Sequence, residues 1–371
     1  MDIENINYPA PKQEYKVLVR CFTYNQSKYI EDALNGFAMQ QTNFPFVCLV
    51  MDDASTDGEQ EVIKAWMERE CDMTRAETID IPTSVVMIVP HIANASCTFA
   101  FYLLKQNLYG TGKKEFYVTP WREKCQYEAI CEGDDYWIDP LKLQQQVDVL
   151  DRNPEYTLSF TNIEIFNEES KTYDKNPLNA YLNDVLPDEK ERLFYYIITN
   201  LCRIQTLTVV YDVRYLSKIK SNSYKFMMGD TPLWLDLSQY GKFHYLSCKT
   251  GVYRVYNGSA SRNNITLAKF RLSMFEMRIY YCNKYGYEVP KRVKHEYNRA
   301  AINLILENSC ESNNLLYPLY KMNALQNIMV NKANEYGYIK NVISIISKIE
   351  LFIYMFFRRI TIVFQKVLIK Y

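Results

Sequence analysis

Three carboxylates lie within four residues of one another, directly after a short apolar run. Glu132, Asp134 and Asp135 follow residues 127–130, which have the composition of a buried strand. Carboxylates this close repel one another and lose solvation. A divalent cation such as Mg²⁺ or Mn²⁺ offsets that cost, because it takes oxygen ligands from one or two carboxylates and from substrate phosphates. The pattern therefore predicts a metal site at a strand end, and a solvated acidic turn before Asp139 is the alternative.

The elements that position these carboxylates are predicted from alternating strands and helices. Apolar, β-rich runs at residues 15–19 and 46–51 each end in a polar break, at residues 20–25 and 52–58. A segment with helical spacing follows each break, and Ser27 is a candidate cap for the first helix. This repetition indicates an α/β sheet, in which ligands bind outside the carboxyl ends of the strands. We therefore expect these two polar breaks and the acidic turn at residues 132–135 to lie together at one edge of the sheet.

Two known ion-binding and phosphate-binding loops are excluded. Residues 53–64 fit the first half of an EF-hand loop, but the twelfth position needs a bidentate glutamate and is Lys64. Residues 110–114 lack the spacing and the Ser/Thr of a P-loop. A solvated loop is the preferred interpretation of this segment, and a point-charge contact from Lys113 or Lys114 to phosphate is the alternative.

Three further positions are candidates for nucleoside contacts or for a catalytic base. Asp53 can accept a hydrogen bond from a base imide or a ribose hydroxyl, and Tyr24 can stack on the base; helix capping and ordinary packing are the alternatives. Asp230 precedes Thr-Pro and an apolar helix start, which is typical of a helix N-cap. A carboxylate shielded from water at that position can also act as a general base, because shielding raises its pKa.

The remaining elements of this half are predicted from short patterns. Residues 85–89 are predicted to form a third strand, residues 192–199 a helix and residues 206–211 a further strand. Residues 90–124 are predicted to be irregular and are rich in Gly and Lys. Residues 167–188 are predicted to form an exposed loop, of the kind that often lies over a ligand-binding site.

Composition excludes several classes of protein. The chain has 371 residues, enough for one large domain plus additions, and Lys+Arg and Asp+Glu are both 43. There is thus no global field to attract nucleic acid, and no nucleic-acid partner is expected. The 10 cysteines include no CxxC pair and no zinc-type spacing, so reduced, buried thiols in a cytosolic protein are expected. Residues 1–11 are polar and acidic and do not resemble a signal peptide.

The N-terminal half resembles the family 2 glycosyltransferases of the GT-A fold, which use nucleotide sugars in polysaccharide and capsule assembly. The resemblance covers roughly residues 16–262 and rests on five segments in the order of the family: 23–25 (TYN), 52–57 (DDASTD), 132–137 (EGDDYW), 229–234 (GDTPLW) and 253–255 (YRV). It implies a Rossmann-like mixed α/β sheet flanked by helices, followed by a helical C-terminal region.

The resemblance also implies roles for individual residues. The implied contacts to the nucleotide and donor are Thr23, Tyr24, Asn25, Asp53, Glu132, Asp134 and Arg254. Asp134 and Asp135 are implied as metal ligands, and Asp230 as the base that activates the acceptor. For Arg254 a structural ion pair is an equal alternative to a diphosphate contact.

The chain departs from the family pattern at three positions. Glu132 stands where the DXD motif begins with Asp, and Gly229 precedes Asp230 where Glu is commoner. Tyr256 stands where many relatives have His, so a histidine contact to metal or phosphate is not expected.

The C-terminal region is predicted to be helical, with apolar residues at helical spacing in 268–283 and 293–307. Residues 339–371 carry six basic residues against one acid, and their longest apolar run, 351–357, is far shorter than the about 20 residues of a membrane span. A basic amphipathic helix on a membrane surface fits this pattern. The alternative is a helix that packs on the core or on a second subunit, so an oligomer is compatible with the sequence.

We therefore expect an N-terminal extension at 1–14, a catalytic domain at 15–263, a helical region at 264–336 and an amphipathic helix at 337–371. The expected function is metal-dependent, inverting transfer of a sugar from a nucleotide donor to a saccharide or lipid-linked saccharide at the cytoplasmic face of the plasma membrane. The resemblance alone implies UDP as the nucleotide. A nucleotidyltransferase is one alternative, but it needs a Gly-rich triphosphate loop after the first strand, and residues 20–27 contain no glycine. A non-catalytic nucleotide- or sugar-binding module is another, and a glycoside hydrolase is disfavoured because it needs two carboxylates across a groove.

Overall fold

The chain forms two compact units in a computed structural model. The structure describes residues 6–174, 179, 182, 186–220, 226–256, 264–306 and 315–320. Unit 1 consists of Met1–Ser223 and Leu233–Asn257, and unit 2 of Tyr224–Pro232 and Gly258–Tyr371.

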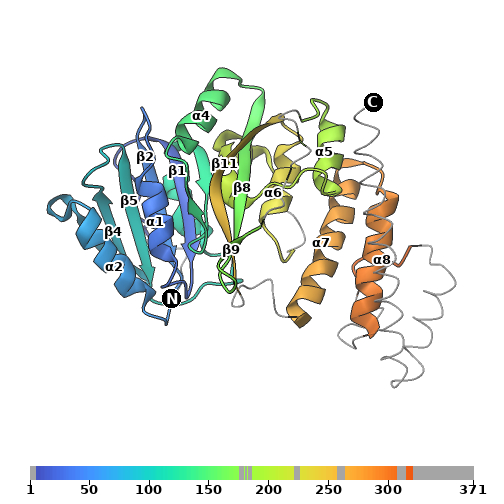
Figure 1. The fold of residues 1–371 in the computed structure, drawn as a ribbon, viewed down its shortest axis with the longest axis horizontal. Helices are drawn as coiled ribbons and strands as arrows, with labels where there is room; N and C mark the ends of the chain where they lie inside the picture. The colour runs from blue at the N-terminus through green and yellow to red at the C-terminus, as the bar shows by residue number, and fades with distance from the viewer. Residues whose placement is uncertain are drawn as a thin grey trace. The chain divides into compact units, whose positions relative to one another are not determined.

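Unit 1 is built on one mixed sheet with helices on both faces (Figure 1). The order of the strands is β3-β4-β5-β2-β1-β6-β10-β8-β11-β7, and β9 pairs with β8. The strands are β1 (Tyr15–Thr23), β2 (Phe46–Asp52), β3 (Glu77–Ile81), β4 (Ser84–Pro90), β5 (Cys97–Leu104), β6 (Cys125–Ile130), β7 (Tyr136–Trp137), β8 (Tyr156–Asn167), β9 (Thr172–Tyr173), β10 (Val210–Asp212) and β11 (Lys242–Val255). The helices are α1 (Ile30–Ala38), α2 (Glu59–Glu70), α3 (Glu115–Arg122), α4 (Lys142–Arg152) and α5 (Lys190–Ile198), with short 3-10 turns η2 (Met73–Arg75), η3 (Thr206–Thr208) and η4 (Val213–Lys218).

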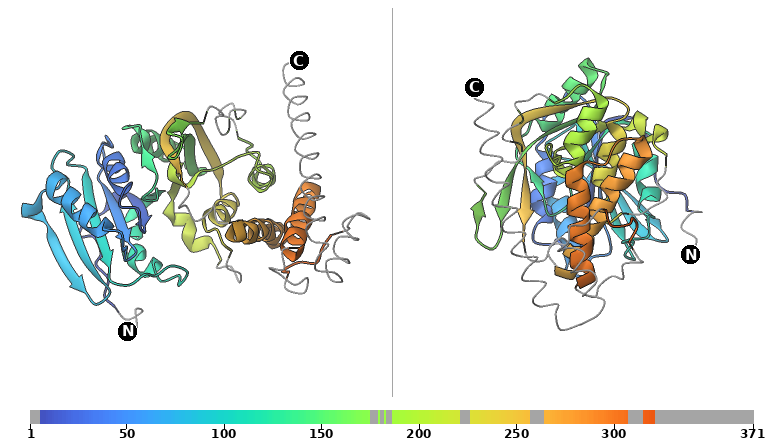
Figure 2. Two further views of the ribbon diagram at one scale, coloured as in Figure 1. Left: turned by 60° about the horizontal axis from the view of Figure 1, so that its bottom comes forward. Right: turned by 90° about the vertical axis from the view of Figure 1, so that its right-hand side faces the viewer.

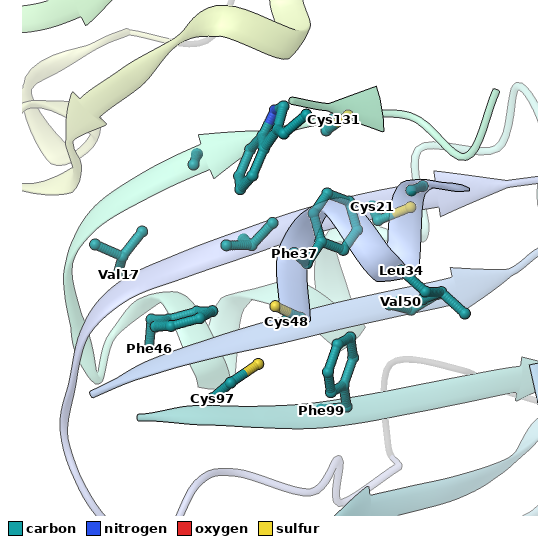
Figure 3. Close-up of a cluster of buried hydrophobic side chains, with 14 of the residues drawn as sticks. Val17, Cys21, Leu34, Phe37, Phe46, Cys48, Val50, Cys97, Phe99 and Cys131 are labelled. Atoms are coloured by element: carbon teal, nitrogen blue, oxygen red, sulfur yellow. The ribbon is translucent and has the colours of Figure 1, made fainter. Parts of the chain in front are cut away.

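The central strands β5, β2, β1 and β6 are parallel, and β2 is buried along its whole length. A strand covered on both faces needs apolar residues in both alternating positions, which explains its continuous apolar sequence. Leu34 and Phe37 of α1 cover one face and lie over Cys48 and Val50 of β2 (Figure 3). The other face packs against α3 through residues such as Trp121. The predicted α/β class, with a mixed sheet flanked by helices, is confirmed.

Unit 2 contains the predicted helices α7 (Asn264–Tyr285) and α8 (Lys291–Leu306), which lie side by side (Figure 2). Gly286 ends α7 at a φ of 72°, a left-handed conformation that glycine adopts without steric cost. Helix α6 (Asp230–Leu237) begins in unit 2, and its residues from Leu233 onward belong to unit 1.

Several local predictions are wrong. Residues 90–124 were expected to be irregular, yet they contain α3 and the strand β5, which is paired on both sides. Ser27 does not cap α1, because the helix begins at Ile30 with Tyr29 as its N-cap residue and no side-chain cap. The expected loop 167–188 instead begins as a hairpin, in which β9 folds back on β8.

The expected strand at 206–211 is also wrong in its first half. Residues 206–208 form η3, and only Val210–Asp212 pair as β10. The carbonyl of Leu207 accepts a hydrogen bond from Trp137 Nε1 at 2.7 Å, and that of Thr208 accepts one from Gln146 Nε2 at 2.9 Å. Buried side chains therefore satisfy carbonyls that a neighbouring strand would otherwise bind.

The structure tests the prediction about the cysteines but not the prediction about the C-terminal helix. Among the described residues no cysteine forms a disulfide, and all of them except Cys248 are buried. The amphipathic helix predicted at 337–371 lies outside the described residues. Among the described helices, none is both long enough and apolar enough to cross a bilayer.

Candidate active site

The three polar segments predicted to meet do lie together at the carboxyl ends of β1, β2 and β6. The parallel register places Thr23 opposite Asp52 across β1 and β2. The N–H of Asp53 donates to the carbonyl of Thr23 at 3.0 Å, and the N–H of Gly133 donates to the carbonyl of Phe22 at 3.2 Å. Backbone hydrogen bonds thus join both acidic segments to the end of β1.

The acidic turn also contacts the end of β1 through its glycine. A Cβ added at Gly133 would lie 2.4 Å from Thr23 Oγ1 and 2.6 Å from Gln26 Oε1. No larger residue fits without moving one of these segments, so Gly133 sets how closely residues 132–135 approach Thr23 and Gln26.

The turn between β1 and α1 is held by side chains of the next turn. The N–H groups of residues 25–27 donate, in order, to Ser55 Oγ at 2.8 Å, Glu59 Oε2 at 2.8 Å and Asp57 Oδ2 at 3.0 Å. Consecutive N–H groups ahead of a helix are an anion-binding arrangement, as in dinucleotide-binding folds. Here the protein's own hydroxyl and carboxylates occupy them, so a substrate phosphate must find its charge partner elsewhere.

Tyr24 and Asn25 have different surroundings in this turn. Tyr24 is 46% exposed, as a ring that stacks on a base must be. Asn25 has a φ of 55°, and its Oδ1 accepts a hydrogen bond from the N–H of Thr56 at 2.8 Å. The side chain of Asn25 therefore joins the two turns.

Asp53 is buried against the segment that follows β5. Its Oδ1 accepts a hydrogen bond from the N–H of Leu108 at 2.6 Å, and its Oδ2 pairs with Lys114 Nζ at 2.9 Å. The Lys114 side chain is only 20% exposed, which corrects the preferred interpretation of this lysine as part of a solvated loop. Each Asp53 carboxylate oxygen thus has one protein partner, and a base that binds Asp53 has to use the remaining lone pairs of these oxygens.

Asp134 and Asp135 are adjacent carboxylates, of which Asp134 is half-buried and Asp135 is buried. Asp135 Oδ1 accepts the N–H of Arg254 at 2.8 Å, and Asp134 Oδ2 accepts the hydroxyl of Tyr256 at 3.1 Å. Burial raises the pKa of both carboxyl groups, and the charge of Asp134 raises the pKa of Asp135 further. Glu132 lies close enough to add to the rise in the pKa of Asp135.

Arg254 on β11 is surrounded by protein groups. Its guanidinium donates to Asp32 Oδ2 at 2.6 Å, to the carbonyl of Asp134 at 2.9 Å and to the carboxylate of Glu168. Its Cζ lies 4.6 Å from the centroid of the Tyr29 ring and 5.0 Å from that of the Tyr136 ring. These contacts match the ion-pair alternative for Arg254 and fix the backbone at Asp134.

Asp230 is the first residue of α6 and belongs to unit 2. Its Oδ1 accepts a hydrogen bond from the N–H of Thr231 at 2.6 Å. The other predicted site residues belong to unit 1. A place for Asp230 beside them stays a prediction.

Sequence reasoning missed Glu59, the first residue of α2. An acidic residue in the first turn of a helix is usually explained by the helix dipole and a solvated position. Glu59 is instead fully buried, and its carboxylate accepts hydrogen bonds from the Thr23 hydroxyl, the Gln26 N–H and the Ser55 hydroxyl. The only signal in the sequence is its position one residue after the polar break at 52–58.

The acidic pair fits a cation that is shared with a ligand. Within the described ranges, no group of three or more His, Cys, Asp and Glu side chains is arranged to hold a metal ion. Asp134 and Asp135 provide carboxylate oxygens only, a donor set that suits Mg²⁺ or Mn²⁺ when substrate phosphates and water complete the coordination. The residues present therefore fit a metal that binds together with a phosphorylated ligand.

Comparisons with known proteins add relatives of undetermined function and similar folds. No family model matches the chain. Uncharacterized proteins of Mycobacterium bovis and Mycobacterium tuberculosis are 32% identical over 166 residues, 45% of this chain and 40% of each relative. The match thus spans less than half the length of these relatives.

Two solved structures are similar in fold at low sequence identity. Residues 1–349 of S. aureus TarS, in complex with UDP, share 14% identity over 88% of this chain and 90% of that one, with a TM-score of 0.47. The mannosyltransferase PcManGT of Pyrobaculum calidifontis, in complex with GDP-Man and Mn²⁺, shares 12% identity over 92% and 88%, with a TM-score of 0.46. None of these similarities assigns the chain to a family.

Proposed function

We propose that the chain is a glycosyltransferase of the family 2 type, which transfers a sugar from a nucleoside diphosphate donor with the help of a divalent cation. The observation that carries this proposal is the junction at the carboxyl ends of β1, β2 and β6. There an exposed aromatic ring, Tyr24, lies on the turn that contacts, through Gly133, two adjacent carboxylates, the half-buried Asp134 and the buried Asp135. A ring for the base and carboxylates for a phosphate-bound cation are what a nucleoside diphosphate requires.

The occupied N–H groups of residues 25–27 support this choice over a nucleotidyltransferase or a dinucleotide-binding enzyme. Both alternatives place phosphates on the backbone of the turn after the first strand. In this chain Asp57 and Glu59 already put negative charge there. Negative phosphates are therefore better placed near Asp134 and Asp135, where a cation held by these carboxylates would offset the negative charge.

Each residue of the site has its own role in the proposed reaction. Tyr24 stacks on the base, while Thr23 and Asp53 contact the nucleoside. Asp134 and Asp135 would hold the cation, and the cation would supply positive charge to stabilise the leaving diphosphate. Arg254 keeps the backbone of Asp134 in place.

Asp230 is the proposed general base. It takes the proton of the acceptor hydroxyl as the new bond from oxygen to the anomeric carbon forms and the bond to the diphosphate breaks. A single displacement of this kind inverts the anomeric centre. We propose UDP as the nucleotide and a saccharide or lipid-linked saccharide as the acceptor, with the C-terminal residues 337–371 on the inner face of the plasma membrane.

The experiment that tests this function is calorimetric titration of UDP, GDP and CDP into the protein, with Mn²⁺ or with EDTA. We expect one nucleotide, UDP, to bind in Mn²⁺ and to bind at least about tenfold more weakly in EDTA. The variant Asp134→Asn removes one carboxylate charge with little change of shape, and should remove the dependence on metal. Absence of nucleotide binding by the wild type under both conditions would overturn the proposal.

A further inference from the structure

Glu59 links the two turns that carry the proposed nucleoside contacts. Its Oε2 accepts the N–H of Gln26 at 2.8 Å and the hydroxyl of Ser55 at 2.9 Å, while its Oε1 accepts the hydroxyl of Thr23. One side chain thus binds the end of β1, the turn before α1 and the turn after β2.

Two of the three partners of Glu59, Thr23 and Gln26, are also the residues that lie against Gly133. Thr23 Oγ1 lies 2.8 Å from Gln26 Oε1, and both atoms lie within 2.6 Å of the position of a Cβ at Gly133. The side chain of Gln26 also hydrogen-bonds the carboxyl of Asp134. A displacement of Thr23 or Gln26 is therefore transmitted directly to the acidic turn.

Glu59 has no cation among the partners described above, which are two hydroxyls and one backbone N–H. Burial raises the pKa of its carboxyl group, although the hydrogen bonds oppose that rise. A buried carboxylate without a cation is costly unless its hydrogen bonds compensate. The position therefore needs acceptors at defined points more than it needs a charge.

We propose that Glu59 is a positioning residue of the nucleotide site, which fixes Thr23 and Gln26 and through them the turn that carries Asp134. This inference rests on the proposed function, since it concerns the same site. It assigns the role to the shape and hydrogen-bonding capacity of the side chain and not to its charge.

Two variants separate shape from charge. In Glu59→Gln, the amide oxygen can keep the bonds from Gln26 and Ser55, while the amide NH₂ donates to Thr23 Oγ1. The single proton of the Thr23 hydroxyl, which Glu59 accepts in the wild type, is then free to be donated to Gln26 Oε1. In Glu59→Asp the charge is retained, but the carboxylate is withdrawn by one methylene. If Glu59 acts through its shape and hydrogen bonds, Glu59→Gln should keep more of the nucleotide affinity than Glu59→Asp. If Glu59 acts through its charge, Glu59→Asp should keep more.

Gln40 provides a matched control away from the site. It is fully buried, and its side chain makes three hydrogen bonds, as many as that of Glu59, here all with backbone groups of Gly36, Asp139 and Leu143. Gln40→Ala should lower thermal stability, as Glu59→Ala should, but should leave nucleotide affinity unchanged below the unfolding transition.

The test measures the Kd of UDP with Mn²⁺ and the melting temperature for the wild type and these variants. We expect Glu59→Ala and Glu59→Asp to weaken UDP binding by about tenfold or more, and Glu59→Gln to stay within about threefold of the wild type. If Glu59→Ala does not fold, the test is whether Glu59→Gln binds UDP more tightly than Glu59→Asp does.

Three outcomes would overturn the inference. They are wild-type affinity in Glu59→Ala or Glu59→Asp, a Gln variant as weak as Asp, or an equal loss of affinity in Gln40→Ala. A wild type that binds no nucleotide would instead overturn the proposed function, so the two failures are distinguishable.

Discussion

Lys142, on α4, is a fully buried amine beneath the strand that follows the acidic turn. Its Nζ donates to Gln146 Oε1 at 2.8 Å and lies 4.3 Å from the centroid of the Trp137 ring. Burial lowers the pKa of this amine to about 7, because a charged ammonium loses its hydration there. The group therefore titrates at very different pH in the folded and unfolded chain.

This difference predicts how stability depends on pH. Between pH about 7 and 10.5 Lys142 is protonated in the unfolded chain but not in the folded chain. The contribution of Lys142 to the free energy of unfolding therefore increases as the pH rises through this range. The slope contributed is about 1.4 kcal/mol per pH unit. Lys142→Met removes it, so the variant should be more stable than the wild type near pH 7, with an advantage that shrinks towards pH 10.

Urea unfolding of both proteins at pH 7, 8 and 9 measures this difference. The exposed lysine Lys64, changed to Met, is the control and should keep the pH slope of the wild type. A difference between Lys142→Met and wild type that does not change with pH would show that the amine is charged in the folded chain.

At the same scale, residue types at strand ends were predictable, but their partners were not. The positions of Asp53, Asp134 and Asp135 follow from apolar runs that stop at acidic residues, which a single sequence shows. That Lys114 pairs with Asp53, or that Glu59 is buried beneath Thr23, depends on residues about 36 to 61 positions apart in the chain. No local pattern encodes such pairs.

At the scale of elements, α1 and β7 are in direct contact through a glycine. A Cβ at Gly36 would lie 2.8 Å from the backbone nitrogen of Trp137 and 3.0 Å from its carbonyl oxygen. The ring of Phe37, next in the helix, lies 5.0 Å from the Trp137 ring in an edge-on arrangement. Because β7 begins directly after Asp135, this contact also supports the acidic turn.

We therefore expect Gly36→Ala to destabilise the fold. Alanine favours helices, but here the backbone of β7 would have to move, and overpacking of this kind costs about 1–3 kcal/mol. Urea unfolding measures the loss. Glu31→Ala in the same helix removes only an exposed ion pair with Arg69, and should cost less than about 1 kcal/mol. Equal stability of Gly36→Ala and wild type would mean that α1 and β7 are not packed this closely.

The elements that sequence analysis predicted correctly are those whose own residues decide their structure. The central strands β1, β2 and β6 are apolar runs bounded by polar breaks, and α7 and α8 have helical spacing. The run 97–104 has the same apolar character as β2, so β5 was detectable, and the Gly- and Lys-rich residues after it obscured the signal. Residues 206–208 were not predictable, because Trp137 and Gln146 decide their conformation from elsewhere in the chain.

At the scale of the whole molecule, the sequence predicts a membrane contact through residues 339–371, which lie outside the described residues. Six basic residues against one acid favour an anionic surface, and each contributes about 1 kcal/mol near such a membrane. We expect the full chain to co-sediment with vesicles that contain phosphatidylserine. The double variant Arg358→Glu and Arg359→Glu should bind at least about tenfold more weakly, and salt should weaken the wild type.

The matched control is a double variant in which two exposed basic residues of unit 1, Arg75 and Lys124, are replaced by glutamate. It changes the net charge by the same amount and should bind vesicles as the wild type does, because the contact is assigned to the C-terminal residues. An equal loss in both double variants would indicate that only net charge matters. If the full chain does not bind vesicles at low salt, the C-terminal segment instead packs on protein, and the acceptor need not be presented at a membrane.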